Sequence, residues 1–342
     1  MPTHPSQLEP AAAPPGRTAC PGRFVVTGGA GFIGSHLAER LLAEGHAVSI
    51  IDDCSTGSLD NLAAVRGHPQ LRVVVAKVSA TPALADLLAG ADAVFHLAAA
   101  VGVELVVRSP IHVLETNLHE TEVLLRAAAS HGTPVLLAST SEVYGRSVKA
   151  SFSEEDDLQI GPPTHARWGY ACSKLMDEFL ALAFAKERGL PVVIARLFNT
   201  VGPRQTGRYG MVLPRFIAAA RAHQPLRVYG DGTQTRCFGY VADTVEALLR
   251  LTRAPAARGQ VFNVGGTEEV SIRELAGRVI RLLGSRSMIE LVPYSEAYEP
   301  GFEDMARRRP AVVRLEQVTG FCPGTPLDRI IAWTAAATPG QH

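Results

Sequence analysis

The stretch RFVVTGGAGFIGSHLAERLLAEGHAVSIID, residues 23–52, decides the fold class of this chain. RFVVTGG is an apolar, β-branched run that ends in glycines, which is typical of a buried strand. Apolar residues then recur at helical spacing at Ile33, Leu37 and Leu41, and this pattern stops at Gly45. HAVSIID reads as a second strand. We therefore predict a strand–helix–strand unit with a glycine-rich turn after its first strand.

The same alternation of strands and helices continues further along the chain. The apolar runs LRVVVAKV, ADAVFHLA, TPVLLAST and PVVIARLFN alternate with helical patterns, one of them from about Pro110 to His131. Parallel strands need crossover connections, which are usually helices. The order therefore predicts an α/β fold of the Rossmann type, a doubly wound parallel sheet with helices on both faces.

The glycine-rich turn predicts a dinucleotide site. Gly28, Gly31 and Gly34 have the spacing G-x-x-G-x-x-G. Glycines at such a turn let the backbone approach a pyrophosphate that binds at the helix N-terminus. Asp52 ends the second strand, 18 residues beyond the last glycine. A carboxylate there accepts the ribose hydroxyls of NAD and would repel the 2′-phosphate of NADP, so we predict NAD as the cofactor.

The pattern divides the chain into three parts. Residues 23–199 are predicted to form the NAD-binding Rossmann domain. Beyond it come glycine-rich loops around a helix near Pro214–Ala222, a strand QVFNVGG and a helix from about Ser271. We assign residues 200–342 mainly to a smaller substrate-binding α/β part, with the chain crossing back to the Rossmann domain. Residues 1–22, rich in Pro and Ala, are predicted to be a disordered extension.

Composition excludes several classes of partner. The 33 basic residues balance 33 acidic ones, so no net charge would attract nucleic acid or an anionic membrane. No apolar run approaches the length of a membrane span. The five cysteines show no C-x-x-C or Cys/His spacing, so we predict neither a disulfide framework nor a metal site. A cytoplasmic location follows from these features as an expectation.

The stretch ARWGYACSKLMDEF, residues 166–179, places Lys174 one helical turn after Tyr170. An ordinary phenol has a pKa near 10 and is protonated at pH 7. An ammonium on the same helix face, together with the positive nicotinamide of NAD⁺, would lower that pKa. Tyr170 could then remove a hydroxyl proton as an alcohol is oxidised. A surface tyrosine with an incidental lysine is the alternative, and the NAD motif upstream disfavours it.

The glycine spacing and the Tyr170/Lys174 pair resemble those of the extended short-chain dehydrogenases/reductases that modify nucleotide sugars. The resemblance runs from about Arg23 to the end of the chain, and it places Thr140 beside the substrate hydroxyl. Lys77 stands where family members commonly carry an Asp for the adenine amino group. The cofactor-binding residues that the resemblance implies are Gly28, Gly31, Phe32, Ile33, Gly34, Asp52, Asp53, Leu97, Tyr170 and Lys174.

The residues beside Thr140 narrow the reaction. The stretch STSEVYG places Ser141 and Glu142 directly after it. In the dTDP-glucose 4,6-dehydratases the comparable stretch carries Asp-Glu, so Ser141 argues against that reaction. UDP-glucose 4-epimerases usually lack the glutamate. The sequence Thr-Ser-Glu is similar to that of the UDP-glucuronate decarboxylases and of the GDP-mannose 4,6-dehydratases.

The segment GFEDMARRRPAVVRLEQVTGFCP, residues 301–323, separates these last two families. It looks like the decarboxylase segment in which an Arg lies two residues before a Pro, here Arg308 before Pro310. An arginine fork can hold a carboxylate through two hydrogen bonds, as a lysine cannot. Arg307 or Arg309 could carry the role if the register differs, and a solvated basic loop is the plain alternative.

The resemblance implies NAD-dependent decarboxylation of UDP-glucuronate, with Thr140, Glu142, Tyr170, Lys174 and Arg308 as the catalytic residues. Once C4 is a ketone, the C6 carboxylate belongs to a β-keto acid and CO₂ can leave. Tyr170 and Thr140 would stabilise the resulting enolate. The product is UDP-4-keto-pentose or, after rereduction, UDP-xylose. The substrate-binding residues that the resemblance implies are Ser141, Glu142, Asn199, Arg208, Tyr229, Arg236 and Arg308.

Three alternatives stay open. Val106 stands where decarboxylases tend to carry a Tyr, so a 4-epimerase acting on UDP-glucuronate or another UDP-hexose is the main alternative. A nucleotide-sugar 4,6-dehydratase is less favoured. A non-catalytic NAD-sensing protein is less favoured because Thr140, Tyr170 and Lys174 are all present. Asn117 matches a buried family Asn that either supports the active site or is purely structural.

The resemblance also implies a homodimer. In this family two helices, here around Glu115–His131 and Tyr170–Arg188, pair with their copies into a four-helix interface. The apolar stripes of these helices would equally fit packing against the sheet alone. The homodimer is therefore an expectation from the family and not from the pattern.

Overall fold

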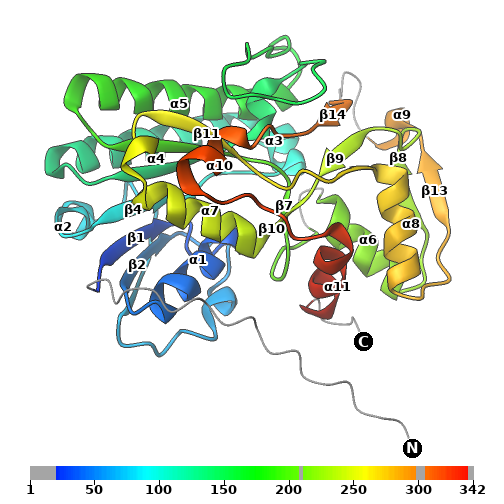
Figure 1. The fold of residues 1–342 in the computed structure, drawn as a ribbon, viewed down its shortest axis with the longest axis horizontal. Coiled ribbons are helices and arrows are strands. Elements are labelled where there is room, and N and C mark those ends of the chain that lie inside the picture. Colours follow the sequence, from blue (N-terminus) through cyan, green and yellow to red (C-terminus); the bar gives the residue numbers. More distant parts are fainter. Residues whose placement is uncertain (1–20, 208–210, 298–304, 338–342) are drawn as a thin grey trace, which may run out of the picture.

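The computed structural model describes residues 21–207, 211–297 and 305–337. Its centre is a parallel sheet of seven strands, with a smaller part of short strands and helices beside it (Figure 1). In spatial order, the strands of the large sheet are β11 (Gln260–Val264), β6 (Val192–Leu197), β5 (Val135–Thr140), β4 (Ala93–His96), β1 (Arg23–Thr27), β2 (Ala47–Asp52) and β3 (Leu71–Val75).

Helices cover both faces of this sheet, as the alternating pattern predicts. One face packs against α1 (Phe32–Ala43), α7 (Val241–Arg253) and α10 (Val313–Thr319). The other face packs against α2 (Leu84–Ala89), α4 (Pro110–His131) and α5 (Arg167–Arg188). The predicted doubly wound Rossmann fold is confirmed. The remaining short helices of this part are η1 (Leu59–Leu62), α3 (Val103–Arg108), η2 (Ser141–Tyr144) and η4 (Pro255–Ala257).

Local sequence signals account for the ends of the two longest helices. Pro110 occupies the first turn of α4, where its missing N–H costs nothing. Gly132 ends α4 at a φ of 67°, and Gly189 ends α5 at a φ of 68°. Glycine adopts this left-handed conformation without strain. Helices α4 and α5 pack side by side, and Tyr170, near the start of α5, lies in the same apolar cluster as Val113 of α4.

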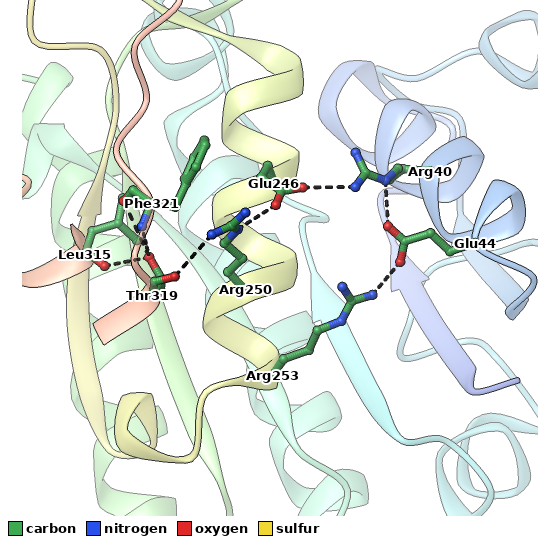
Figure 2. A network of polar contacts seen from close by, with 8 residues as sticks. All are labelled: Arg40, Glu44, Glu246, Arg250, Arg253, Leu315, Thr319 and Phe321. Atoms are coloured by element: carbon green, nitrogen blue, oxygen red, sulfur yellow. Dashed lines mark hydrogen bonds and ion pairs between the residues drawn. The ribbon is translucent and has the colours of Figure 1, made fainter. Parts of the chain in front are cut away.

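Helix α7 is part of the sheet domain although it comes late in the sequence. Arg40 on α1 donates to Glu246 on α7 at 3.1 Å, and Arg250 donates to the same carboxylate at 2.6 Å. Arg253 is paired with Glu44 across the same junction (Figure 2). Exposed pairs of this kind contribute at most about 1 kcal/mol each, so they orient α7 while apolar burial holds it.

The smaller part has its own core, built from α6, α8 and α11 around short strands. Ser271 caps α8 by accepting a hydrogen bond from the Glu274 backbone N–H, which agrees with the helix predicted from about Ser271. The helices are α6 (Val212–Arg221), α8 (Ile272–Leu282), α9 (Tyr294–Ala297) and α11 (Leu327–Ala337). The strands are β7 (Thr200–Val201), β8 (Leu226–Tyr229), β9 (Thr235–Cys237), β10 (Gly239–Tyr240), β12 (Glu269–Ser271), β13 (Ile289–Val292) and β14 (Arg307–Arg308).

The sequence pattern did not predict every element. Helices α7, α10 and α11 and the short paired strands were not anticipated. Strand β11 lies in the large sheet, beside β6, although in sequence it comes between segments of the smaller part. The domain boundaries at residues 23, 199 and 200 stay a prediction. Within the described residues no helix combines the length and apolar character that crossing a membrane requires.

Candidate active site

A cavity of about 610 Å³ opens at the carboxyl ends of the parallel strands and is lined by residues of both the sheet domain and the smaller part. Open α/β sheets bind their ligands at this edge. The structure brings nearly all predicted site residues to this cavity; Arg208 lies outside the described residues. Those that line it are Gly28, Gly31, Phe32, Ile33, Gly34, Asp52, Asp53, Leu97, Thr140, Ser141, Glu142, Tyr170, Lys174, Asn199, Tyr229, Arg236 and Arg308.

The glycine turn between β1 and α1 fits a dinucleotide pyrophosphate. Gly28 has a φ of 71°, and a Cβ there would lie 2.7 Å from the Ala98 backbone N. A Cβ on Gly34 would lie 2.2 Å from the Gly28 carbonyl oxygen. Gly31 is the N-cap residue of α1, and no side chain makes a capping hydrogen bond to this helix. The first turn of α1 contains no acidic residue. The helix N-terminus therefore presents backbone N–H groups to an anion.

Asp52 supports this turn from the end of β2. Its carboxylate accepts hydrogen bonds from the Ala30 N–H at 2.9 Å and the Cys54 N–H at 2.8 Å. Each carboxylate oxygen keeps further acceptor capacity, so ribose hydroxyls can still bind. Burial raises the pKa of Asp52 above its ordinary value, and the two backbone hydrogen bonds oppose that rise. Asp53 is exposed and lines the same cavity.

Tyr170 projects from α5 into the cavity beside the end of β5. A hydrogen bond joins it to Thr140, whose hydroxyl also accepts the Glu142 backbone N–H at 3.2 Å. Burial raises the pKa of Tyr170 above its ordinary value, and the Glu142 carboxylate adds to the rise. The sequence led us to expect a lowered pKa for Tyr170. The protein chain without NAD⁺ does not lower it.

Lys174 already has a partner on its own helix. Its Nζ lies 2.8 Å from Oδ2 of Asp177, and both side chains are buried, at 3% and 0% exposure. The Lys174 charge is therefore paired within α5, and the Asp177 carboxylate further raises the pKa of Tyr170. Asp177 was not among the predicted site residues, because the Tyr-x-x-x-Lys pattern does not include it.

Arg308, on β14, joins the smaller part to the carboxyl edge of the sheet. It donates to Oε1 of Glu142 at 3.2 Å and to Oδ1 of Asn199 at 2.7 Å. Among the described residues, its buried Nε–H has no hydrogen-bond partner. Arg309 is exposed and lies 3.9 Å from Glu269, so the structure favours Arg308 among the three arginines. The arrangement leaves a guanidinium N–H free for an anionic ligand.

A buried network of polar side chains holds the end of β5, the strand that carries Thr140. Ser139 donates to Glu178, which is also held by the Arg196 guanidinium at 2.7 Å. Arg196 donates to the Tyr144 hydroxyl at 3.0 Å, and Tyr144 donates to Asn263 at 2.7 Å. These residues were missed at the sequence level because they come from α5, η2 and three strands. A satisfied buried network of this kind holds the β5 end rigid.

His96, at the end of β4, is buried between the sheet and α4. Its ring nitrogens contact the hydroxyls of Thr27 at 2.7 Å and Thr121 at 3.1 Å. Burial lowers the pKa of His96 to about 3, and the nearby Lys174 charge acts in the same direction. The imidazole is therefore neutral in the folded protein at neutral pH.

This depressed pKa predicts a pH dependence of stability. In the unfolded chain His96 binds a proton below about pH 6.5, whereas in the folded protein it does so only near pH 3. The free energy of unfolding therefore falls as the pH drops through that range. The contribution is about 1.4 kcal/mol per pH unit. In His96→Asn, the free energy of unfolding, measured with urea at several pH values between pH 6 and pH 4, should depend less steeply on pH. The difference in slope should be about 1.4 kcal/mol per pH unit. Equal slopes would contradict the assignment.

Tyr229 and arginines of the smaller part also line the cavity. The Arg215 guanidinium lies 4.9 Å from the centre of the Tyr229 ring and donates to its hydroxyl. Arg236, on β9, is buried and lines the same cavity. Arg215 was not predicted; its place in the first turn of α6, one residue after a Pro, was the available signal. Arginines and an aromatic ring suit a nucleoside diphosphate.

Three further positions have structural explanations. Asn117 is buried, accepts the Ala100 N–H at 2.7 Å and donates to Ser173 on α5, which ties α4 to the helix that carries Tyr170. Val106 is buried and packs with Tyr170 in an apolar cluster, so it offers no hydrogen bond there. Lys77 is exposed at the rim of the cavity.

Residues 24–265 match the model of the NAD dependent epimerase/dehydratase family. The chain belongs to this family. The membership confirms the predicted resemblance and the predicted NAD cofactor, whose pyrophosphate the glycine turn fits. It also shows that the chain is an enzyme of the extended short-chain dehydrogenase/reductase class.

Two curated members of the epimerase/dehydratase family are similar over most of the chain. A UDP-N-acetyl-alpha-D-glucosaminuronate decarboxylase of Bacillus cytotoxicus is 41% identical, covering 88% of this chain and 92% of the relative. UDP-glucuronic acid decarboxylase 1 of Danio rerio is 34% identical, covering 90% of this chain and 70% of the relative.

Solved structures of the epimerase/dehydratase family have the same fold. The UDP-glucuronic acid 4-epimerase from Bacillus cereus, in complex with UDP-glucuronic acid and NAD, is 26% identical with a TM-score of 0.83, covering 92% of this chain and 98% of that one. The epimerase Mth375 from Methanothermobacter thermautotrophicus is 27% identical with a TM-score of 0.84, covering 93% of this chain and 92% of that one.

Proposed function

We propose that the chain is an NAD-dependent decarboxylase of UDP-glucuronate, which oxidises C4 of the sugar and releases CO₂ from C6. The observation that carries the proposal is Arg308. Its buried Nε–H lacks a partner among the described residues, and it lies in the same cavity as Tyr170. A guanidinium with a free N–H beside the catalytic phenol suits a substrate carboxylate. Relatives named for decarboxylation support the same reading.

The residues divide the chemistry among them. Bound NAD⁺ would supply the oxidant for C4 and later the reductant for the keto product. Tyr170, hydrogen-bonded to Thr140, takes the proton of the C4 hydroxyl and then hydrogen-bonds the enolate oxygen that forms as CO₂ leaves. Arg308 orients the carboxylate, and Glu142 helps to reprotonate C5.

The nucleotide half of the substrate is assigned to the smaller part. Asn199 and Arg236 are proposed to bind the diphosphate, with Tyr229 and Arg215 near the uridine. Asn199 also accepts from Arg308, so it couples diphosphate binding to the position of the carboxylate-binding guanidinium.

The direct test is to incubate the purified protein with UDP-glucuronate and NAD⁺ and to follow products by mass spectrometry. We expect a product about 44 mass units lighter if it is UDP-xylose, from loss of CO₂, or about 46 lighter if it is UDP-4-keto-pentose, which has also lost two hydrogens to NAD⁺. A product of unchanged mass that is the C4 epimer would instead establish the epimerase alternative.

UDP-N-acetylglucosaminuronate is a second candidate substrate. The relative at 41% identity is named for it, and Val106 contributes an apolar side chain beside Tyr170 where a Tyr would be bulkier. Measuring kcat/KM for both uronates decides between them. A clear preference for the 2-acetamido sugar would change the assigned substrate and leave the decarboxylation unchanged.

We further propose that the protein is a cytoplasmic homodimer that pairs through α4 and α5. The support for the dimer is a set of exposed apolar side chains on these two adjacent helices. On α4 they recur at i, i+3 and i+7. They are Ile111, Leu114 and Leu118 on α4 and Met176 and Phe179 on α5. Large apolar surfaces of this kind mark interaction sites.

Placing a charge on this face should separate the dimer. Phe179 is 61% exposed in the single chain, so Phe179→Glu should fold normally yet elute at the mass of one chain, where the unchanged protein elutes at twice that mass. Met288→Glu is the matched control, because Met288 is 75% exposed beside β13, away from α4 and α5. Light scattering after gel filtration makes the measurement. A dimeric Phe179→Glu would exclude this interface.

A further inference from the structure

Lys174 and Asp177 form a buried ion pair. The two side chains lie one turn apart on α5, and Nζ lies 2.8 Å from Oδ2. Their exposures are 3% and 0%. An isolated ammonium at such a site would lose solvation and shift its pKa down by up to roughly 3–5 units. Removing one partner of a buried pair leaves the other charge uncompensated.

The catalytic pattern does not explain Asp177. Tyr170 and Lys174 satisfy it without a carboxylate at the third position beyond the lysine. The neighbouring Glu178 already has its own partners, Arg196 and Ser139. Asp177 is thus a buried carboxylate that pairs with Lys174 and also accepts a hydrogen bond from Thr121.

We propose that Asp177 is a positioning residue that keeps Lys174 in its ammonium form inside the protein across the neutral and alkaline pH range. The charge that Lys174 presents to the cofactor is then available at every pH at which the enzyme works. Only this last step, the contact of Lys174 with NAD, rests on the proposed function.

The other ionisable groups around the pair do not replace Asp177. These groups are Tyr170 and Glu178 on α5, His96 on β4, Glu120 on α4, Glu142 on η2, Arg196 on β6 and Arg308 on β14.

Most of these groups are already balanced. His96 is neutral at neutral pH, since burial lowers its pKa to about 3. Glu178 is paired with Arg196, and Glu142 with Arg308. Burial raises the pKa of Asp177, and the Lys174 charge and a hydrogen bond from Thr121 oppose that rise. Asp177 therefore supplies the negative charge that balances Lys174.

The protonation state of Lys174 can be read directly, because the chain has only four lysines. Protein labelled with ¹³C at lysine Cε gives four resonances whose shifts report the charge of each ammonium. Lys77, Lys149 and Lys186 are exposed, so their Lys→Arg variants assign three signals and leave Lys174 by elimination.

The titration midpoint of Lys174 should be lower in Asp177→Asn than in the unchanged protein, by at least about two pH units. Glu187→Gln removes an exposed carboxylate from the same helix and should leave the midpoint in place. An unchanged midpoint in Asp177→Asn would overturn the proposal. So would a Lys174 midpoint below pH 8 in the unchanged protein, a result that requires no variant to fold.

NAD⁺ affinity measured against pH separates this proposal from the proposed function. The unchanged protein should bind NAD⁺ equally between pH 6 and pH 9, whereas Asp177→Asn should lose at least about tenfold in affinity over that range. If the Lys174 midpoint falls while the affinity of the variant stays flat, Asp177 holds the charge as proposed. The assigned contact of Lys174 with the cofactor is then wrong.

Discussion

Tyr170→Phe is expected to abolish turnover, lowering kcat by roughly 10³-fold, which is the usual contribution of a general acid–base group. The change removes one oxygen and keeps the ring that packs with Ala100, Val106 and Val113. The fold and the glycine turn should therefore be unaffected, and NAD⁺ affinity should stay within about threefold. The first measurement is the rate of turnover of UDP-glucuronate. The second is the affinity for NAD⁺, measured by fluorescence.

The control for this variant is Tyr240→Phe. Tyr240 packs against Trp333 in the smaller part, with ring centres 4.9 Å apart, away from the catalytic edge. It should keep full turnover. If Tyr170→Phe turns over at a rate near that of the unchanged protein, another group is the base and the Tyr170/Lys174 assignment is wrong.

Arg308→Ala is expected to remove recognition of the uronate carboxylate. Truncating one partner of a buried, hydrogen-bonded charge pair costs roughly 2–5 kcal/mol, which corresponds to a loss of about 30-fold or more in kcat/KM for UDP-glucuronate. Glu142 also loses its cationic partner, so its charge is left less compensated. Binding of UDP alone, which has no carboxylate, should change far less. Steady-state kinetics and UDP titration give both values.

Arg309→Ala is the matched control for Arg308→Ala. Arg309 is the next residue in the chain, its side chain is 47% exposed, and it lies near Glu269 rather than in the catalytic set. It should keep kcat/KM within about twofold. If Arg308→Ala decarboxylates normally while Arg309→Ala does not, the register of the arginine segment is wrong by one residue. If neither variant has an effect, the carboxylate is held elsewhere.

Much of the sheet domain could be predicted because its signals are local. Strands β1 and β2 are short apolar runs, and the glycines between them sit where a Cβ would clash with backbone atoms. The Tyr-x-x-x-Lys pair lies within one helical turn. Such features are encoded by neighbouring residues, so periodicity and turn chemistry suffice to find them.

The elements that were missed depend on contacts between distant residues. Strands β7 and β10 have two residues each, and β14, which carries Arg308, likewise has two, so their sequences are too short to show a strand period. Helix α7 has a helical pattern of its own, but its place against α1 depends on residues some 200 positions away, such as Arg40 and Glu246.

For the candidate site, too, the sequence indicated the residues with local signals and not the contacts between distant residues. The sequence identified Thr140, Tyr170 and Arg308, but not that Arg308 contacts Glu142 from 166 residues away. It also led us to expect that Lys174 lowers the pKa of Tyr170, whereas Lys174 is paired with Asp177. The partner of a buried charge is a tertiary property, which single-sequence patterns do not contain.

The most direct test of the proposed chemistry uses UDP-glucuronate labelled with deuterium at C4 and ¹³C at C6. With NAD⁺, we expect ¹³CO₂ to be released, and any UDP-xylose formed to carry the deuterium again at C4. This result would place oxidation at C4 before decarboxylation, at one site. A product that keeps its ¹³C and changes only its configuration at C4 would contradict decarboxylation.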